Sequence, residues 1–412
     1  MDTLKHIAFL HYSCPPVVGG VEEVLYQQAS VFHRHGHSVM VIAGSGGKFT
    51  DQYQILINPI IGSRDPDILA AHRKMSDNRH ELDILTDKIT DFLFESLLNM
   101  DVLIAHNVLT MPYNLPLTLA LHRVAESGVI EVVGWNHDSL LFYEEHPQYL
   151  YEEPWEIIRV PNPGIHYITI SDMRKRQFED LYGGTTALTI IPNGIDPAGF
   201  FHLDPKVDQL IIENRLFEAD LLLLQPSRLH PRKNIELSIK VIRAINELGV
   251  KARLLLTGSY DPHGESTFEY FRDLKSLAKE IEVEDDILFL TEYLIPRDEK
   301  LSTDRIILRD LFMIADILFM PSLSEGFGIP LLEAGLAKLP IVCSEIPPFR
   351  EVGGQDVRFF SLEDTPEDIA RSILEFTGDL PLHRMFRQVI NNFLWDNIYK
   401  QKLLPLVERI TS

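Results

Sequence analysis

The sequence predicts two doubly wound α/β domains in tandem, each built on a parallel β-sheet with helices on both faces. Short apolar runs alternate with longer amphipathic runs along all 412 residues. The apolar runs lack polar alternation, which is typical of strands that are covered on both faces. The same rhythm returns in the second half, and the length suits two domains that each bury a core.

The first half is expected to contain seven strands, because that many short apolar runs are bounded by turn residues or by helical periodicity. They span residues 6–13, 38–44, 54–59, 101–107, 129–137, 166–171 and 188–193. Helical patterns follow several of these strands, as at residues 20–37 and 115–128.

The second half repeats the pattern. Its expected strands span residues 220–227, 252–259, 287–292, 317–322, 340–345 and 357–362, and its clearest helices span 234–249, 266–281 and 328–339. Proline and glycine cluster at residues 192–205, which indicates the boundary between domains 1–197 and 198–380. We expect the two domains to face each other across a cleft at the carboxyl ends of their strands, where open α/β sheets bind ligands.

Composition excludes several classes of partner. The net charge of −22 excludes nucleic-acid binding and allows at most weak peripheral contact with an anionic membrane. Cys14 and Cys343 lie far apart and predict no disulfide framework. The apolar run after Met1 is too short for a signal peptide, and no run reaches the roughly 18 apolar residues of a membrane span, so we expect a cytoplasmic protein. No motif indicates an oligomeric state.

The stretch SEGFGIPLLEAG, residues 324–335, joins an expected strand to an expected helix. Gly328 lets a ligand approach the backbone, and Pro330 suits the first helical turn, so the helix would present its N-terminus to an anion. Glu325 and Glu333 would repel a phosphate unless they accept hydrogen bonds from hydroxyls on either side of it. A nucleotide sugar has that order of groups. The alternative is a capped helix with a surface glutamate.

A basic loop, PSRLHPRKN, follows the expected strand at 220–227. Arg228 and Lys233 would neutralise the charge that grows on a diphosphate leaving group, without a metal ion. A solvated basic loop is the alternative.

Two loops of the first half also follow expected strands. In SCPPVVGGVEEV, Gly19 and Gly20 precede a helix and would allow a substrate close to the backbone, although a tight turn uses the same residues. In GWNHDS, His137 is suited to hydrogen bonding a sugar or phosphate, and Asp138 to orienting His137 or binding an acceptor. A lone histidine is more often structural.

Together these motifs resemble those of the retaining glycosyltransferases of family 4, which have the two-domain GT-B fold. The matching segments are EGFGIPLLE, SRLHPRK, PPVVGGVE, the HD pair and IPNGID. The tail at residues 393–406 resembles the C-terminal helix of that family, so we expect residues 381–412 to cross back to the first domain. Ser227 stands where many relatives have glycine.

The resemblance implies a role for each candidate residue. In the second domain, Arg228 and Lys233 are expected to hold the donor diphosphate, and Glu325 is expected to hold the sugar together with Phe327, Gly328 and Ile329. Glu333 is expected to hold the ribose. Tyr293 and Leu294 are expected to hold the base. In the first domain, Gly19 and Gly20 are expected at the acceptor and diphosphate edge, and Asp138 is expected to bind substrate. His137 is expected to contact the transferred sugar, so that His137, Arg228, Lys233 and Glu325 form the catalytic set.

The implied reaction is transfer of a hexose, with retention, from a GDP-mannose or UDP-glucose type of donor to a hydroxyl of a small or sugar-like acceptor. No metal and no cofactor is expected, because Asp65-x-Asp67 lies in a loop-like context that does not suit a metal site. The aromatic and acidic segment 140–155 is expected near the acceptor, and the basic stretch 173–177 could hold one phosphate of it. The alternatives are a nucleotide-sugar epimerase of the same fold and a non-catalytic nucleotide-sugar-binding protein.

Overall fold

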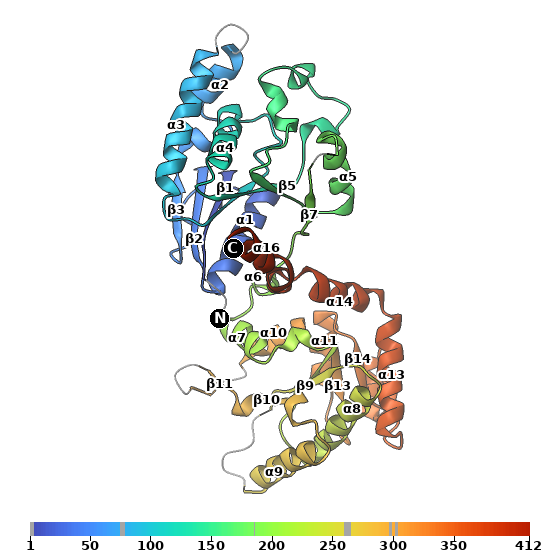
Figure 1. The fold of residues 1–412 in the computed structure, drawn as a ribbon. Coiled ribbons are helices and arrows are strands. Elements are labelled where there is room, and N and C mark those ends of the chain that lie inside the picture. The colour runs from blue at the N-terminus through green and yellow to red at the C-terminus, as the bar shows by residue number, and fades with distance from the viewer. Residues whose placement is uncertain (1–3, 75–78, 185, 259–264, 296–298, 301–303) are drawn as a thin grey trace. The chain divides into compact units, whose positions relative to one another are not determined.

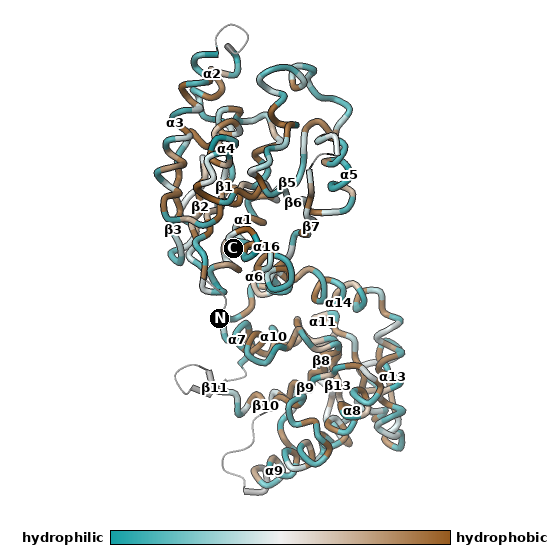
Figure 2. Tube along the Cα trace, viewed as in Figure 1, coloured by the Kyte–Doolittle hydropathy of each residue, from teal (hydrophilic) through white to brown (hydrophobic). Residues whose placement is uncertain are grey.

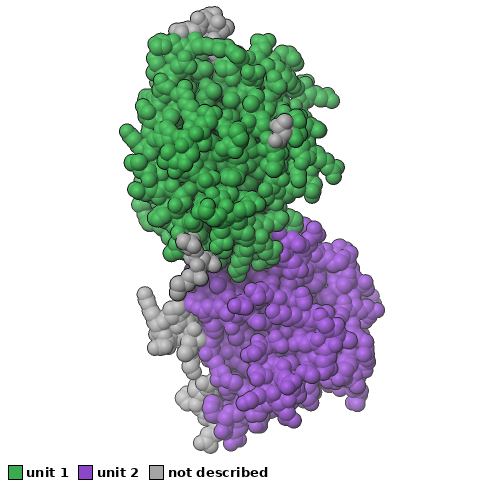
Figure 3. All heavy atoms as spheres, viewed as in Figure 1, with its two compact units in different colours: residues 1–196, 393–412 green, residues 197–392 purple. Residues whose placement is uncertain are grey.

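The computed structural model describes residues 4–74, 79–184, 186–258, 265–295, 299–300 and 304–412. The chain divides into two compact units (Figure 3). Unit 1 combines Met1–Asp196 with Phe393–Ser412, and unit 2 is Pro197–Asn392. The predicted class of two doubly wound α/β domains is confirmed, whereas their facing across a cleft stays a prediction.

Unit 1 is built on a seven-stranded parallel sheet in the order β3-β2-β1-β4-β5-β6-β7 (Figure 1). Its strands are β1 (His6–Ser13), β2 (Ser38–Ser45), β3 (Gln54–Ile57), β4 (Val102–His106), β5 (Glu131–Asn136), β6 (Ile165–Thr169) and β7 (Leu188–Ile190). Its helices are α1 (Gly20–Arg34), α2 (Pro66–Lys74), α3 (His80–Ser96), α4 (Leu115–Ser127), α5 (Asp172–Leu181), α15 (Trp395–Ile398) and α16 (Leu404–Ile410).

Unit 2 is built on a six-stranded parallel sheet in the order β10-β9-β8-β13-β14-β15. These strands are β8 (Leu221–Gln225), β9 (Ala252–Leu256), β10 (Ile287–Phe289), β13 (Ile317–Met320), β14 (Ile341–Ser344) and β15 (Arg358–Phe360), and a small antiparallel pair is formed by β11 (Leu294–Ile295) and β12 (Glu299–Lys300). The helices are α6 (Pro197–Phe201), α7 (Pro205–Glu213), α8 (Ile235–Glu247), α9 (Glu265–Glu280), α10 (Arg305–Ile314), α11 (Ile329–Ala337), α12 (Pro347–Gly353), α13 (Pro366–Asp379) and α14 (Pro381–Phe393).

Each sheet has a hydrophobic core on both faces, and its strands are mostly brown in Figure 2. Side chains of a strand alternate between faces. In β1, Ala8 and Leu10 join the core under α3 and α4, while Ile7 and Phe9 join the core under α1. Burial on both faces explains why the strand sequences lack polar alternation, and each run that was predicted to be a strand overlaps an observed strand. None of the helices among the described residues has the length and apolar character needed to cross a membrane.

The C-terminal segment joins unit 1 at Phe393. The sequence analysis placed the start of this segment earlier, at residue 381. The helix α14 belongs to unit 2 as far as Asn392. Its Arg387 donates to the carbonyl of Ala219 and lies 3.6 Å from the buried carboxylate of Asp316, which His383 also contacts at 3.1 Å. These buried polar contacts hold α14 to unit 2, although its amphipathic sequence does not show against which sheet it packs.

The last twenty residues pack against α1 and β1 in unit 1. Leu394 forms a parallel bridge with Ile195, and Trp395 and Ile398 are buried in the same core as Phe9. A Cβ added at Gly194 would lie 2.7 Å from the indole of Trp395, so this close approach requires glycine. The C-terminal segment is therefore part of the core of unit 1.

We predict that Ile398→Ala lowers the free energy of unfolding of unit 1 by about 2–5 kcal/mol, because it leaves a cavity in a closed core. Tryptophan fluorescence in a urea titration measures this unit alone, since the three tryptophans, Trp135, Trp155 and Trp395, all lie in it. Lys400→Ala, at an exposed position two residues on, is the matched control. Equal midpoints for the two variants would contradict the prediction.

Candidate active site

In unit 2 the predicted site residues follow strands that are neighbours in the sheet. Lys233 lies in the loop after β8, and Glu325 in the loop after β13, and these two strands pair in parallel. Their carboxyl ends therefore meet at one edge, which brings a cation and a carboxylate together. The structure confirms that the two loops meet, although their sequences are more than ninety residues apart.

Glu325 is held by three donors. Lys233 Nζ pairs with Oε1, Ser322 Oγ donates to Oε1 at 2.8 Å, and Arg232 Nη1 donates to Oε2 at 3.2 Å. The side chains of Glu325 and Lys233 are only 9% and 11% exposed. Glu325 is thus a fixed anion among cations. Arg232 is a further member of the site, to which the sequence analysis gave no role.

Buried hydrogen bonds fix the backbone of the loop after β8. Gln225 Nε2 donates to the carbonyl of Lys233 at 3.0 Å, and Ser238 Oγ donates to Gln225 Oε1 at 2.6 Å. These groups are buried and satisfy one another, so they fix the start of the Lys233 side chain. A lysine that is held in place loses little freedom when its ammonium binds an anion.

Arg228 lies on the exposed side of the same loop. Among the described residues it has no hydrogen-bond or ion-pair partner, so its guanidinium is available to a ligand. The backbone beneath it is in close contact with the end of β9, because a Cβ added at Gly258 would lie 1.8 Å from the carbonyl oxygen of Ser227. Glycine at position 258 is therefore required for this loop conformation.

The helix α11 begins immediately after the Glu325 loop. Gly328 has a φ of +113°, and a Cβ there would meet the ring of Phe349 at 3.1 Å, so the turn into the helix requires glycine. Phe327 and Ile329 are exposed on either side of it. Glu333 is partly exposed and finds no partner among the described residues, which leaves its carboxylate able to accept hydrogen bonds.

Tyr293 and Leu294, the predicted contacts of the base, lie after β10. The hydroxyl of Tyr293 donates to Glu213, and burial, followed by this carboxylate, raises the pKa of the phenol above its usual range. Leu294 pairs in β11 with Lys300. Pro296, at the end of the predicted base-binding segment 291–296, lies outside the described residues.

In unit 1, His137 follows β5 and is almost fully buried. Asn107 Oδ1 accepts hydrogen bonds from the backbone N–H groups of His137 and Asp138 at 3.0 and 2.8 Å, which fixes this turn. Burial, with a smaller contribution from the nearby His11, lowers the pKa of His137 to about 3. The imidazole is therefore neutral near pH 7 and acts as a hydrogen-bonding group without charge.

Two further histidines form a cluster with His137 that the sequence analysis missed. His106 Nδ1 lies 3.4 Å from His137 Nε2, and His11 Nδ1 lies 2.7 Å from the carbonyl oxygen of His106. Their common signal is position, because each lies near the carboxyl end of one of the adjacent strands β1, β4 and β5. Burial lowers the pKa of His11 and of His106 as well, so the cluster is uncharged near neutral pH.

Asp138 does not orient His137. Its carboxylate instead accepts from Tyr143 at 2.6 Å and pairs with Arg174 at 3.0 Å. Arg174 belongs to the basic stretch 173–177 that was expected to hold a phosphate, and Lys175 of that stretch lies 3.7 Å from Glu179. Most of the charge of this stretch is thus neutralised within the protein.

The glycine pair of unit 1 opens α1. Gly19 caps the helix in an extended conformation, and the carboxylate of Glu22 lies over it, with an oxygen only 2.1 Å from where a Cβ would be. Glu22 also accepts from Ser13 Oγ at 2.5 Å. A carboxylate of the protein therefore already occupies the space beside Gly19, whereas the space around Gly20 is open.

The Asp65-x-Asp67 pair has a structural role. Asp65 Oδ1 accepts hydrogen bonds from the backbone N–H groups of Asp67 and Ile68 at 2.9 and 3.2 Å, so Asp65 caps α2. Across the described ranges, no group of three or more histidine, cysteine, aspartate or glutamate side chains is placed to hold a metal ion.

Both halves of the chain match sequence models of known protein families. A sequence model described as Glycosyltransferase Family 4 matches residues 18–198, and one described as Glycosyl transferases group 1 matches residues 207–392. The chain belongs to glycosyltransferase family 4. Each match falls almost entirely within one of the two doubly wound domains of its GT-B fold.

Two curated relatives of this glycosyltransferase match most of its length. The mannosylglucosylglycerate synthase of Petrotoga mobilis is 24% identical over 364 residues, which cover 79% of this chain and 81% of that protein. The enzyme of the same name from Thermotoga maritima is 24% identical over 383 residues, with 87% and 85% covered. A shorter match of 39% over 69 residues, covering 17% of this chain and 8% of the relative, is to the serotype-specific mannosyltransferase WbdA of Escherichia coli.

The neutral histidines predict how the stability of this glycosyltransferase depends on pH. Burial lowers the pKa of His72 and His122 to about 4 and is the main reason that His137 titrates near 3. Unfolded histidines bind protons below about pH 6.5, whereas these folded ones stay neutral until about pH 4, so stability falls as pH decreases through that window. The slope is about 1.4 kcal/mol per pH unit for each extra proton that the unfolded state binds.

Urea titrations at pH 7 and pH 5, followed by tryptophan fluorescence, measure this change in unit 1. His122→Gln should reduce the slope, and His6→Gln, at an exposed histidine, is the control. A free energy of unfolding that is constant or larger at pH 5 would contradict the prediction.

Proposed function

We propose that this protein transfers a mannosyl group, with retention, from a nucleoside diphosphate sugar to a hydroxyl of a small sugar-like acceptor. The observation that carries this proposal is the meeting of Lys233, Arg232 and Glu325 at the ends of β8 and β13. Cations held at the ends of parallel strands suit a diphosphate, and the fixed carboxylate among them suits the hydroxyls of the sugar attached to it.

Unit 2 supplies the groups that the donor needs. Lys233 and Arg228 neutralise the charge that develops on the diphosphate as the bond to the sugar breaks. Glu325 accepts hydrogen bonds from the sugar, beside the backbone of Phe327, Gly328 and Ile329. Glu333 binds the ribose hydroxyls through its carboxylate, and the base lies near Tyr293 and Leu294.

The proposed chemistry uses the leaving group itself. The bond between the anomeric carbon and the phosphate oxygen breaks, the acceptor oxygen forms its bond on the same face, and the acceptor proton passes to the departing phosphate oxygen. Configuration is retained because entry and departure share one face. In unit 1, neutral His137 donates a hydrogen bond to the transferred sugar without adding a positive charge beside an oxocarbenium-like centre. The role requires neither a divalent metal nor a cofactor.

The choice of mannose and of a small acceptor draws on the relatives. The two long matches are named for a product in which mannose is joined to glucosylglycerate, and the short match is named as a mannosyltransferase. We therefore propose GDP-mannose as the donor ahead of UDP-glucose, and a small glycoside such as glucosylglycerate as the acceptor.

The test is transfer from GDP-mannose or UDP-glucose to glucosylglycerate in the presence of EDTA, with the anomeric configuration of the product read by NMR. We expect a mannosylated product with the configuration of the donor. Lys233→Ala should lower kcat by about 10²–10³, or roughly 3–4 kcal/mol, because its charge acts on the leaving group in the transition state.

Lys240→Ala, at an exposed position in α8, is the matched control and should keep full activity. Three outcomes would contradict the proposal: a product of inverted configuration, activity that is lost with EDTA and restored by magnesium or manganese, or an unchanged rate in folded Lys233→Ala.

A further inference from the structure

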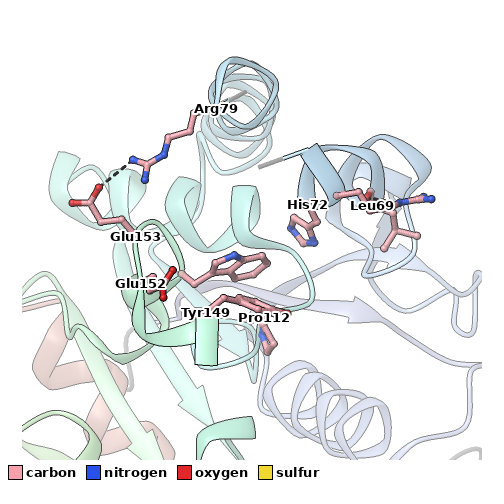
Figure 4. A pocket seen from close by; sticks show the side chains of 9 residues that line it. Leu69, His72, Arg79, Pro112, Tyr149, Glu152 and Glu153 are labelled. Atoms are coloured by element: carbon pink, nitrogen blue, oxygen red, sulfur yellow. Dashed lines mark hydrogen bonds and ion pairs between the residues drawn. The ribbon is translucent and has the colours of Figure 1, made fainter. Parts of the chain in front are cut away.

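Unit 1 contains a pocket of about 720 Å³ (Figure 4), and His11, His106 and His137 are not among its lining residues. Its volume is in the range of roughly 300–1,000 Å³ that is usual for pockets that bind small molecules. The lining residues that bear on its chemistry are His72, Arg79, Tyr149, Glu152, Glu153 and Trp155.

The pocket is formed by segments that follow strands of the unit 1 sheet. His72 lies on α2, which follows β3, Pro112 lies in the loop after β4, and Tyr149 and Trp155 lie in the segment after β5. Since His137 also follows β5, the pocket and His137 lie at the same carboxyl edge of one sheet. Ligands of open parallel sheets bind at this edge.

Aromatic rings make up the floor of the pocket. Trp155 is only 8% exposed and packs in a core cluster with Leu115 and Leu150. Its indole lies 4.9 Å from the ring of His72, at 65°, and 5.3 Å from the ring of Tyr149, at 54°. Tyr149 is 47% exposed, so the cluster presents a broad aromatic surface on a fixed support.

The polar groups around this surface are directional and nearly neutral in sum. His72 Nε2 accepts from the backbone N–H of Leu115 at 3.3 Å, so the proton of the neutral ring is on Nδ1, which is left as a donor. The carboxylate of Glu152 has no partner among the described residues. Arg79 and Glu153 pair at 3.1 Å across the rim, as the dashed line in Figure 4 shows, and their charges cancel.

We propose that this pocket binds a neutral hexose ring, namely the sugar part of the acceptor, which rests on the proposed function. The apolar C–H face of a pyranose packs on an aromatic surface, while its hydroxyls take the His72 donor and the Glu152 acceptor. An anion in this pocket would be repelled by the carboxylates of Glu152 and Glu153. Of the cations that line the pocket, Arg79 is paired with Glu153, and Arg73 is exposed with its Nε bonded to the carbonyl of Leu69.

The experiment measures saccharide binding by the full chain without any nucleotide. The probes are glucosylglycerate and its neutral analogue methyl α-glucoside, with inorganic phosphate for comparison, studied by saturation-transfer NMR and calorimetric titration. We expect the wild type to bind both saccharides. Tyr149→Ala should raise their Kd by about tenfold, because an exposed aromatic anchor is lost.

Tyr151→Ala is the matched control, since Tyr151 is an exposed tyrosine of the same segment that does not line the pocket. It should bind as the wild type does. Glu152→Gln, a change of one charge at similar size, provides a second variant that is expected to fold and should also weaken binding. Circular dichroism verifies the fold of each variant.

The outcomes separate this inference from the proposed function. If mannosyl transfer occurs but Tyr149→Ala and Glu152→Gln keep the acceptor Kd and KM of the wild type, the pocket inference is wrong and the proposed function stands. If the wild type binds the saccharides at this pocket but forms no product from any donor, the pocket is a saccharide site and the proposed function is wrong. Binding of phosphate in place of methyl α-glucoside overturns the saccharide class.

Discussion

The ion pair between Lys233 and Glu325 is the interaction on which the arrangement of unit 2 depends. It joins the loops that follow two adjacent parallel strands, and it lets each loop keep a charged side chain that is nearly buried. An ammonium or a carboxylate in such a position is costly unless it is paired and hydrogen-bonded. Gln225 and Ser238 fix the loop that carries Lys233, and Ser322 donates a hydrogen bond to Glu325. Both loops are therefore held by residues at or near the ends of the strands.

The same pair bears on which ligands the proposed site would accept. In the proposed function, a diphosphate would compete with Glu325 for Lys233, and a hydroxyl beside that diphosphate would give Glu325 a new partner. A nucleotide sugar offers both groups at once. A free anion would satisfy only the cations and would leave Glu325 opposed to it. The pairing therefore favours a ligand that carries phosphate and sugar together.

The strand ends of unit 1 differ from those of unit 2 in their charge. Its three clustered histidines are buried and neutral, and Asp138 is neutralised by Arg174, so little free charge faces the end of β5. Hydrogen bonds rather than ion pairs are then available there, which suits a sugar. The pocket around Trp155 extends the same character along the sheet edge, with aromatic rings and polar groups whose charges nearly cancel.

Much of this arrangement could be predicted from sequence because parallel strands are continuous apolar runs and site residues follow them. The strands of both sheets and the boundary near residue 196 follow from that pattern. Contacts that depend on tertiary direction could not be predicted. Arg232 contacts Glu325, and Asp138 contacts Arg174. The spacing of residues in the sequence predicts neither contact. The pattern of α14 shows an apolar face but not the sheet that it packs on.

The affinity of GDP for Glu325→Gln, measured by calorimetric titration beside Lys233→Ala, tests the central claim most directly. If Glu325 competes with the diphosphate for Lys233, removing its charge should leave GDP binding at least as tight as in the wild type, and up to about tenfold tighter, while sugar transfer falls. Lys233→Ala should bind GDP more weakly. A loss of GDP affinity in Glu325→Gln as large as that in Lys233→Ala would contradict the account.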